Sequence, residues 1–284
     1  MRWQNRRESS NVEDRRSMSG RKLAVGGGLG SVVLVVLYLL LGGNLGENMP
    51  DLQLSTDAAG PAESRPLTAE ETAAGQFVSV ILADTEDVWN SIFNAQGRTY
   101  VEPKLVLFTD LTDSACGTAQ AATGPFYCPG DQKVYIDLGF FAEMQRRLNA
   151  PGDFAQAYVI AHEIGHHVQN QLGIMEQVMP LRNRLSEQEY NALTVRLELQ
   201  ADFLAGVWAH HAQRMQDILE EGDIEEGINA AGSVGDDRIQ KMTQGYVVPD
   251  AFTHGTSEQR MRWFMKGFKT GDLAQGDTFN ATAL

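Results

Sequence analysis

The sequence predicts a mainly helical α+β domain with a small antiparallel sheet, preceded by one transmembrane helix. Apolar residues recur at helical spacing in several stretches after residue 68, whereas only 104–109 and 133–137 are short, apolar and β-prone. Residues 23–43 contain no charged side chain. The chain of 284 residues is 43% hydrophobic and 21% charged, a balance typical of globular proteins. One sizeable folded domain is therefore expected beside the apolar segment.

Charge divides the chain near residue 22. Residues 1–22 carry seven basic and three acidic side chains, whereas the other 262 residues carry 16 basic and 34 acidic ones. The acidic surplus argues against nucleic acid or anionic lipid as a ligand of the domain, and only weakly favours basic peptides. The basic segment itself could contact nucleic acid or anionic lipid, but its interspersed acidic residues weaken that interpretation. We interpret it as an orientation signal.

The uncharged stretch 23–43 is long enough to cross a membrane. Its 21 residues would form a helix of about 31 Å, against a hydrocarbon core of about 30 Å. A cleaved signal peptide is the alternative, but the long N-terminal region and the lack of a clear small-x-small site favour an uncleaved anchor. The positive-inside rule then places residues 1–22 in the cytoplasm and the domain outside.

Local signals divide the rest of the chain. Residues 44–67 are rich in Gly, Pro, Asp, Ser, Thr and Ala and predict a flexible linker, so the domain comprises 68–284. Capping boxes begin at Thr68 and Ser186. Helices are predicted at 68–94, 138–148, 154–172, 186–215, 223–242 and from about 256 to 268, and strands at 104–109 and 133–137. The second strand either offers a free edge to an extended peptide or lies inside the sheet.

The chain has two cysteines, Cys116 and Cys128, which enclose eleven residues of a loop-like region. A zinc-binding pair is conceivable. A location outside the cytoplasm and a count of two favour a disulfide that closes this loop. Such a bond would stabilise the fold by about 3 kcal/mol in the chain-entropy model.

The motif His162-Glu163-Ile164-Gly165-His166 lies in the predicted helix 154–172. Residues four apart share one helix face, with Cβ atoms roughly 5–6 Å apart, so His162 and His166 can bind one Zn²⁺ ion. Glu163 then lies beside the metal, where a general base for a zinc-bound water belongs. The alternative is a helix whose histidines are half-buried packing residues. A third ligand would decide between them.

Glu198 and Asp202 supply a candidate third ligand and its support. They lie four residues apart on the predicted helix 186–215, so Glu198 can bind zinc while Asp202 accepts a hydrogen bond from a ligand histidine. A solvated acidic face is the alternative. The apolar neighbours of Asp202, which are Ala201, Phe203 and Leu204, argue against it. Two histidines and one glutamate leave a fourth position for water, as in catalytic zinc sites.

These motifs resemble a known family. His-Glu-Ile-Gly-His followed by Glu-Leu-Gln-Ala-Asp resembles the gluzincin branch of zinc metallopeptidases. The chain as a whole is similar to the bacterial, membrane-anchored neutral zinc metallopeptidases described as YpfJ-like. The stretches that carry this similarity are Arg2–Gln4, Arg6–Ser9, Asn11–Arg16, Cys116–Asp137, the histidine motif, Glu198–Trp208 and His254–Phe268. The resemblance implies a zincin-like fold, peptidase activity and an inner-membrane location, with His162, His166 and Glu198 as ligands and Glu163 as base.

His254 precedes the last predicted helix, which Thr256 or Ser257 can cap. Zinc peptidases often use a histidine or tyrosine to donate a hydrogen bond to the oxyanion of the tetrahedral intermediate, and His254 resembles a candidate for that role. Arg260 can pair with an acidic residue of the site. A structural motif that fixes the last helix explains the same residues.

The functional hypothesis is a membrane-anchored zinc peptidase that hydrolyses peptide or protein substrates by Glu163-assisted attack of zinc-bound water. Two alternatives stay open. The domain could be a zinc-bearing module that binds envelope partners without turnover, or a zinc amidase that acts on cell-wall peptide. The presence of a base argues against the first, and nothing in the sequence excludes the second.

Overall fold

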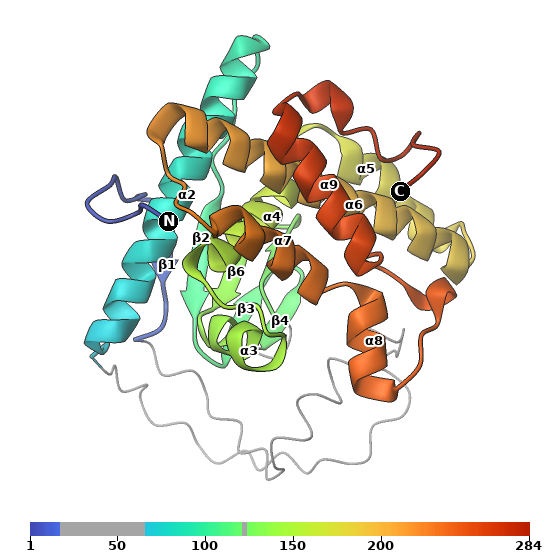
Figure 1. Cartoon of the computed structure of the whole chain (residues 1–284), viewed down its shortest axis with the longest axis horizontal. Coiled ribbons are helices and arrows are strands. Elements are labelled where there is room, and N and C mark those ends of the chain that lie inside the picture. Colours follow the sequence, from blue (N-terminus) through green and yellow to red (C-terminus); the bar gives the residue numbers. More distant parts are fainter. Residues whose placement is uncertain (18–65, 121–123) are drawn as a thin grey trace.

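The computed structural model describes residues 1–17, 66–120 and 124–284 of the chain (Figure 1). The helices are α2 (Ala69–Ala95), α3 (Gly139–Arg147), α4 (Asp153–Gln171), α5 (Ile174–Val178), α6 (Glu187–Gln216), α7 (Asp223–Ser233), α8 (Asp236–Gln244) and α9 (Ser257–Thr270), with short 3₁₀ turns η2 (Met179–Asn183), η3 (Pro249–Ala251) and η4 (Leu273–Gln275). The mainly helical α+β prediction is confirmed. The predicted anchor at 23–43 lies outside the described residues, as does nearly all of the linker. Among the residues that are described, no helix is both long and apolar enough to span a membrane.

The strands are β1 (Val12–Asp14), β2 (Lys104–Phe108), β3 (Leu111–Ser114), β4 (Gly117–Gln120), β5 (Phe126–Cys128) and β6 (Lys133–Asp137). In the described chain, β1, β2, β6 and β5 form one sheet in that order, and β3 and β4 form a separate hairpin. The predicted antiparallel sheet is wrong, because β1–β2 and β2–β6 pair in parallel and only β5–β6 is antiparallel. The strand at 133–137 is an inner strand, and β5 forms the edge.

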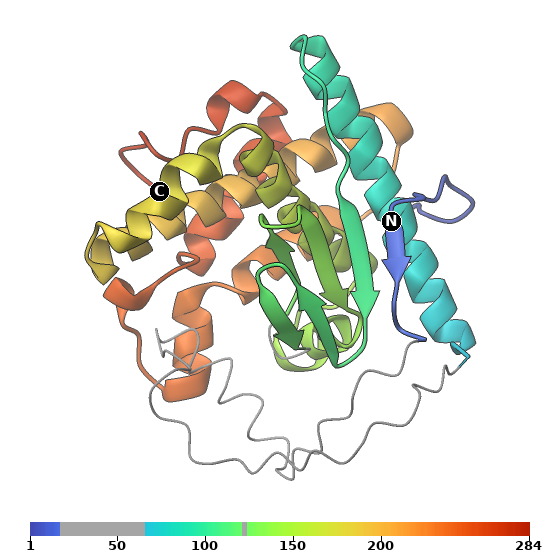
Figure 2. The same ribbon diagram turned by 180° about the vertical axis from the view of Figure 1, so that it is seen from behind.

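The two faces of this sheet contact different parts of the fold. Leu105, Leu107, Val134 and Ile136 are buried in the main core with residues of α2, α4 and α6. Val106, Phe108 and Tyr135 point the other way, into a small cluster with Ala119 and Cys128. This alternation is the two-residue period of a strand. Figure 2 shows the sheet from behind, with α2 along one side and β1 at its edge.

Local signals placed the helices well. The capping boxes at Thr68 and Ser186 are both formed, and a third, from Thr256 to Gln259, begins α9. The prediction of one helix at 223–242 is wrong in one respect. This segment forms two helices, α7 and α8, which are separated by Val234 and Gly235. A Cβ atom at Gly235 would lie 2.3 Å from the backbone nitrogen of Ser257. The break therefore lets the start of α8 lie against the start of α9.

The disulfide between Cys116 and Cys128 is present, as predicted. It joins the β3–β4 turn to the end of β5. Tyr127, the residue before Cys128, accepts a hydrogen bond on its hydroxyl from Asn170 Nδ2 at 3.0 Å, and this oxygen lies 3.1 Å from His167 Nδ1. The bonded strand is therefore fastened to the helix that carries the histidine motif.

Residues 1–17, here called the N-terminal arm, pack along the domain. The strand β1 extends the sheet beside β2. Arg6 forms two hydrogen bonds with Asp84 at 2.7 and 2.8 Å, and Arg7 binds Glu86 at 3.0 Å. Asp84 and Glu86 lie on α2, and each is only 2% exposed. The arm therefore neutralises carboxylates that the fold buries.

These contacts correct the predicted topology. A chain that crossed a membrane once between residues 23 and 43 would hold the arm and residues 68–284 on opposite sides, where they could not touch. The ion pairs and the β1–β2 ladder contradict a cytoplasmic N-terminal segment with the domain outside. The arginines that were interpreted as an orientation signal, among them Arg2, Arg6 and Arg7, have acidic partners within the fold.

Replacing Arg6 by alanine tests this interpretation of the arm. The buried Asp84 would lose its bidentate partner, and the free energy of unfolding should fall by about 3 kcal/mol. The exposed pair of Arg2 with Asp217 is a matched control, and Arg2→Ala should cost less than about 1 kcal/mol. Urea unfolding of the full chain measures both. Equal, small effects would mean that the arm does not stabilise the domain.

Candidate metal centre

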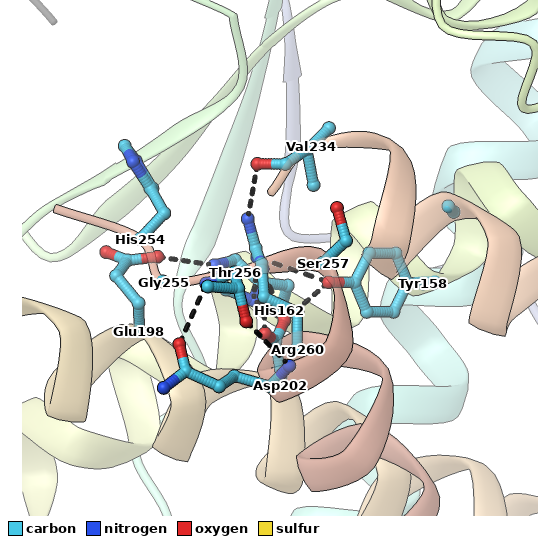
Figure 3. Close-up of polar contacts among 12 residues, drawn as sticks. Tyr158, His162, Glu198, Asp202, Val234, His254, Gly255, Thr256, Ser257 and Arg260 are labelled. Carbon is cyan, nitrogen blue, oxygen red and sulfur yellow. Dashed lines mark hydrogen bonds and ion pairs between the residues drawn. The ribbon is translucent and has the colours of Figure 1, made fainter. Parts of the chain in front are cut away.

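Three side chains, two from α4 and one from α6, converge between these helices. Nε2 of His162 lies 3.1 Å from Oε2 of Glu198, and Nε2 of His166 lies 3.4 Å from Oε1. The possible ligand atoms all lie within 4.8 Å of one another. In Figure 3, Glu198 and His162 face each other. The structure therefore brings together the three predicted metal ligands.

A close approach of the two helices makes this convergence possible. Gly165 lies inside the histidine motif, and a Cβ atom there would meet the backbone oxygen and Cα of Ala201 at 3.0 and 3.2 Å. Ala201 lies between Glu198 and Asp202 on α6. Such distances are shorter than ordinary van der Waals contacts. A glycine at this position therefore lets α6 place its two carboxylates against the histidines, at the cost of weaker helix propensity.

Each candidate ligand histidine is held by its Nδ1 atom, the other ring nitrogen. Nδ1 of His162 lies 2.8 Å from Oδ1 of Asp202, as predicted, and Nδ1 of His166 lies 2.9 Å from Oε1 of Gln169. Gln169 is fully buried and donates to the carbonyl oxygen of Leu197 at 2.7 Å. Acceptors on both Nδ1 atoms favour the tautomer whose Nε2 lone pair faces Glu198. The histidines are thus oriented to bind a cation.

Asp202 is the centre of a buried polar network. Arg260 donates to its two oxygens from Nε and Nη2 at 2.8 and 2.9 Å, and the hydroxyl of Tyr158 donates to Oδ1 (Figure 3). Arg260 also donates to the carbonyl oxygen of Val234 at 3.3 Å. Burial opposes ionisation of Asp202, but Arg260 and His162 outweigh it and lower its pKa to about 2. Asp202 therefore stays anionic and fixes His162 to α9.

Glu163 lies next to the ligands but differs from them. Its side chain is 8% exposed, and its carboxylate has no hydrogen-bond partner among the described residues. No oxygen of Glu163 is among the fully buried side-chain atoms that lack a partner, so its carboxylate reaches solvent-accessible space. Such a group is available to a water molecule or a substrate atom at the centre.

His254 is placed by α8. Its Nδ1 lies 3.2 Å from Oδ1 of Asp236, and Oδ2 of Asp236 accepts hydrogen bonds from the backbone nitrogens of Thr253, His254 and Gly255 at 2.6–3.0 Å. Burial opposes protonation, yet the Asp236 carboxylate and the nearby Glu198 raise the pKa of His254. Figure 3 shows His254 above Glu198. No hydrogen bond joins it to a ligand in the described part of the chain.

Sequence reasoning missed several of these residues. Gln169 and Tyr158 lie three residues after His166 and four before His162, so their helical spacing could have indicated them. Asp236 gave no such signal, because its contact with His254 spans 18 residues. His167, which directly follows the histidine motif, is fully buried, and burial lowers its pKa to about 4.

Comparison with known proteins agrees with this centre. A family model described as "Putative neutral zinc metallopeptidase" matches residues 1–279. The chain belongs to this family. Within it, "Uncharacterized protein YpfJ" of Escherichia coli (strain K12) is 50% identical over 285 residues, which cover 98% of this chain and 99% of the relative. "Uncharacterized protein Rv2575" of Mycobacterium tuberculosis (strain H37Rv) is 38% identical over 74% of each chain. No solved structure matches the chain significantly.

The family description implies zinc, and the three side chains fit that ion. Imidazole nitrogen and carboxylate oxygen are ordinary zinc ligands, and ligand bonds of about 2.0–2.1 Å in a tetrahedron separate the ligand atoms by roughly 3.3 Å. The two nitrogen–oxygen distances here are 3.1 Å to Oε2 and 3.4 Å to Oε1 of Glu198, and one ligand atom from each residue lies within 4.8 Å of the others. Two imidazole nitrogens and one carboxylate would leave one tetrahedral position for a small molecule.

Gln169 provides a test that does not depend on activity. In Gln169→Ala the ring of His166 loses its acceptor, and zinc affinity should fall by about 10- to 100-fold. Competition with a chromogenic zinc chelator measures the affinity. The exposed Gln177, which follows on α5, is the matched control, and Gln177→Ala should bind zinc normally. An unchanged affinity in a folded Gln169→Ala protein would contradict the role assigned to Gln169.

Proposed function

We propose that this protein is a zinc-dependent peptidase of the gluzincin type, with His162, His166 and Glu198 as metal ligands. One observation carries the proposal. The possible ligand atoms of His162, His166 and Glu198 lie within 4.8 Å of one another, and Glu163 follows His162 on α4 with no hydrogen-bond partner among the described residues. A structural zinc site is closed by four protein ligands, whereas a catalytic one keeps a position open. This centre has three ligands and an adjacent base.

The residues divide the chemistry among them. A zinc ion supplies a Lewis acid that acidifies bound water and polarises a carbonyl group. Glu163 accepts a proton from the attacking water and later returns it to the leaving amine. Asp202 and Gln169 keep the two imidazoles in place throughout. Arg260 keeps Asp202 ionised, so the charge beside His162 stays constant during turnover.

His254 is the proposed donor to the oxyanion. Thr253 Oγ1, at 2.9 Å, and Asp236 Oδ1, at 3.2 Å, hold its Nδ1, which leaves Nε2 free to donate to a negative oxygen that forms near Glu198. The three backbone hydrogen bonds to Asp236 fix the loop, so little reorganisation is needed when charge develops.

Peptide substrates suit the edge of the sheet. β5 pairs with β6 on one side and with no other described strand. An extended peptide can add to such an edge through its main chain, which is a common mode of peptide recognition. The disulfide and the contacts of Tyr127 with α4 hold this strand beside the helix of the histidine motif. We assign peptides or proteins as substrates for this reason.

The proposed location is the outer side of the bacterial inner membrane. Disulfides persist in oxidising compartments, so the bond between Cys116 and Cys128 supports a site outside the cytoplasm. The apolar segment 23–43 is the proposed membrane attachment. Because the arm packs on the domain, both lie on the same side of that membrane.

Replacing Glu163 by glutamine tests the reaction. The amide has nearly the same shape but cannot accept a proton, so Glu163→Gln should retain zinc while cleavage of a mixed peptide library falls by at least about 100-fold. Glu198→Ala should instead lose zinc. Metal analysis and mass spectrometry of the peptides measure the two properties. Undiminished cleavage by Glu163→Gln would refute the proposed mechanism.

Variants of His254 and Asp236 separate catalysis from structure. His254→Phe should lower kcat by about 100-fold with little change in KM, because the hydrogen bond forms only as the oxyanion develops. Asp236→Asn should lower kcat less, because the ring keeps its position but loses the neighbouring charge. A normal kcat with a lower melting temperature in His254→Phe would assign the residue to fold stability.

A further inference from the structure

An exposed apolar patch lies at the end of α8. Seven large apolar side chains of the described residues are strongly exposed, and four of these lie between residues 242 and 248. They are Met242 at 54%, Tyr246 at 63%, Val247 at 39% and Val248 at 37%. The other three, Val101, Met179 and Met215, are far from one another in sequence. Clustered apolar side chains on a soluble surface indicate an interaction site.

The patch is held on a fixed backbone. The helix α8 ends at Gly245 in the left-handed conformation. The backbone nitrogen of Val248 donates to Oε1 of Gln240 at 2.7 Å, and the next turn is fastened to α6 where Gln188 donates to Asp250 at 2.9 Å. The apolar side chains are thus exposed because the local fold holds them outward.

The segment around the patch carries a few charges of both signs. The chain contains 37 acidic residues and has a net charge of −14. Residues 238–249 carry Arg238 and Lys241, and Asp236, Asp237 and Asp250 flank them. Apolar side chains beside cations, with a tyrosine among them, are the composition of protein surfaces that rest on lipid.

The two ends of the described chain that border the gap, residues 17 and 66, also lie on this side of the molecule. Arg16, near the end of the arm, donates to the backbone oxygen of Glu71 at 2.5 Å, so residues 17 and 66 flank the start of α2. Figures 1 and 2 both place the start of α2 and α8 along the same lower edge. The 48 residues between these points include the uncharged stretch 23–43. A membrane that holds this stretch would therefore lie below that edge.

We infer that Met242, Tyr246, Val247 and Val248 dock on the surface of the lipid bilayer to which residues 23–43 attach the protein. The inference rests on the proposed membrane attachment and does not depend on peptidase activity. The helix α8 has nine residues and begins at Asp236, which holds the loop of His254.

The test uses the full chain reconstituted in vesicles of phosphatidylethanolamine and phosphatidylglycerol. Tyr246→Cys carries an environment-sensitive fluorophore, and Met215→Cys, which is 47% exposed, is the matched control. Met215 lies two residues before Asp217, which forms an ion pair with Arg2 at the start of the N-terminal arm. The control position is therefore at the opposite end of the arm from Arg16. The native cysteines are bonded and do not react.

The emission of the fluorophore at position 246 should shift to shorter wavelength, and spin-labelled lipids should reduce its intensity at least about twofold. The emission of the fluorophore at position 215 should remain typical of a water-exposed site. A water-like spectrum at position 246 would overturn the inference, as would failure of the protein to float with the vesicles. A blue shift without quenching by the lipids would also overturn it, because a second copy of the chain would then cover the patch. Peptide cleavage by the same samples reports the proposed function separately.

Discussion

The buried carboxylate of Asp202 is the interaction on which the arrangement of the centre depends. It joins His162 of α4, its own helix α6 and Arg260 of α9. A lone carboxylate in such a position would be costly to bury, and only the bidentate arginine and the tyrosine hydroxyl make it tolerable. Removing any one partner leaves the others with an unmatched charge or donor. The metal ligands are therefore positioned by three helices together.

The close contact of α4 with α6 is the second constraint. Gly165 permits it, and the carboxylates on either side of Ala201 gain their positions from it. The residue that weakens α4 as an isolated helix thus has a packing function. The same division of roles appears at α8, where Gly235 lies against Ser257 and allows Asp236 to bind the loop of His254.

Local patterns predicted the helices and the centre better than they predicted the sheet. The spacing of His162 and His166, and of Glu198 and Asp202, follows from helix geometry, so a sequence contains it. The order of the strands does not follow in this way, because β1 and β2 are about 90 residues apart and pair only through tertiary contacts. The arginines of the arm show a further limit. Basic residues before an apolar segment have the same appearance whether they orient a membrane protein or, as with Arg6 and Asp84, neutralise buried acids.

The central claim is that His162, His166 and Glu198 bind one zinc ion. Crystals of the purified full chain, measured on both sides of the zinc absorption edge, test it directly. The account predicts one anomalous peak at about 2.0–2.2 Å from Nε2 of each histidine and from a carboxylate oxygen of Glu198. A zinc-loaded protein whose anomalous peak lies elsewhere, or a fully folded protein that binds no zinc, would contradict it.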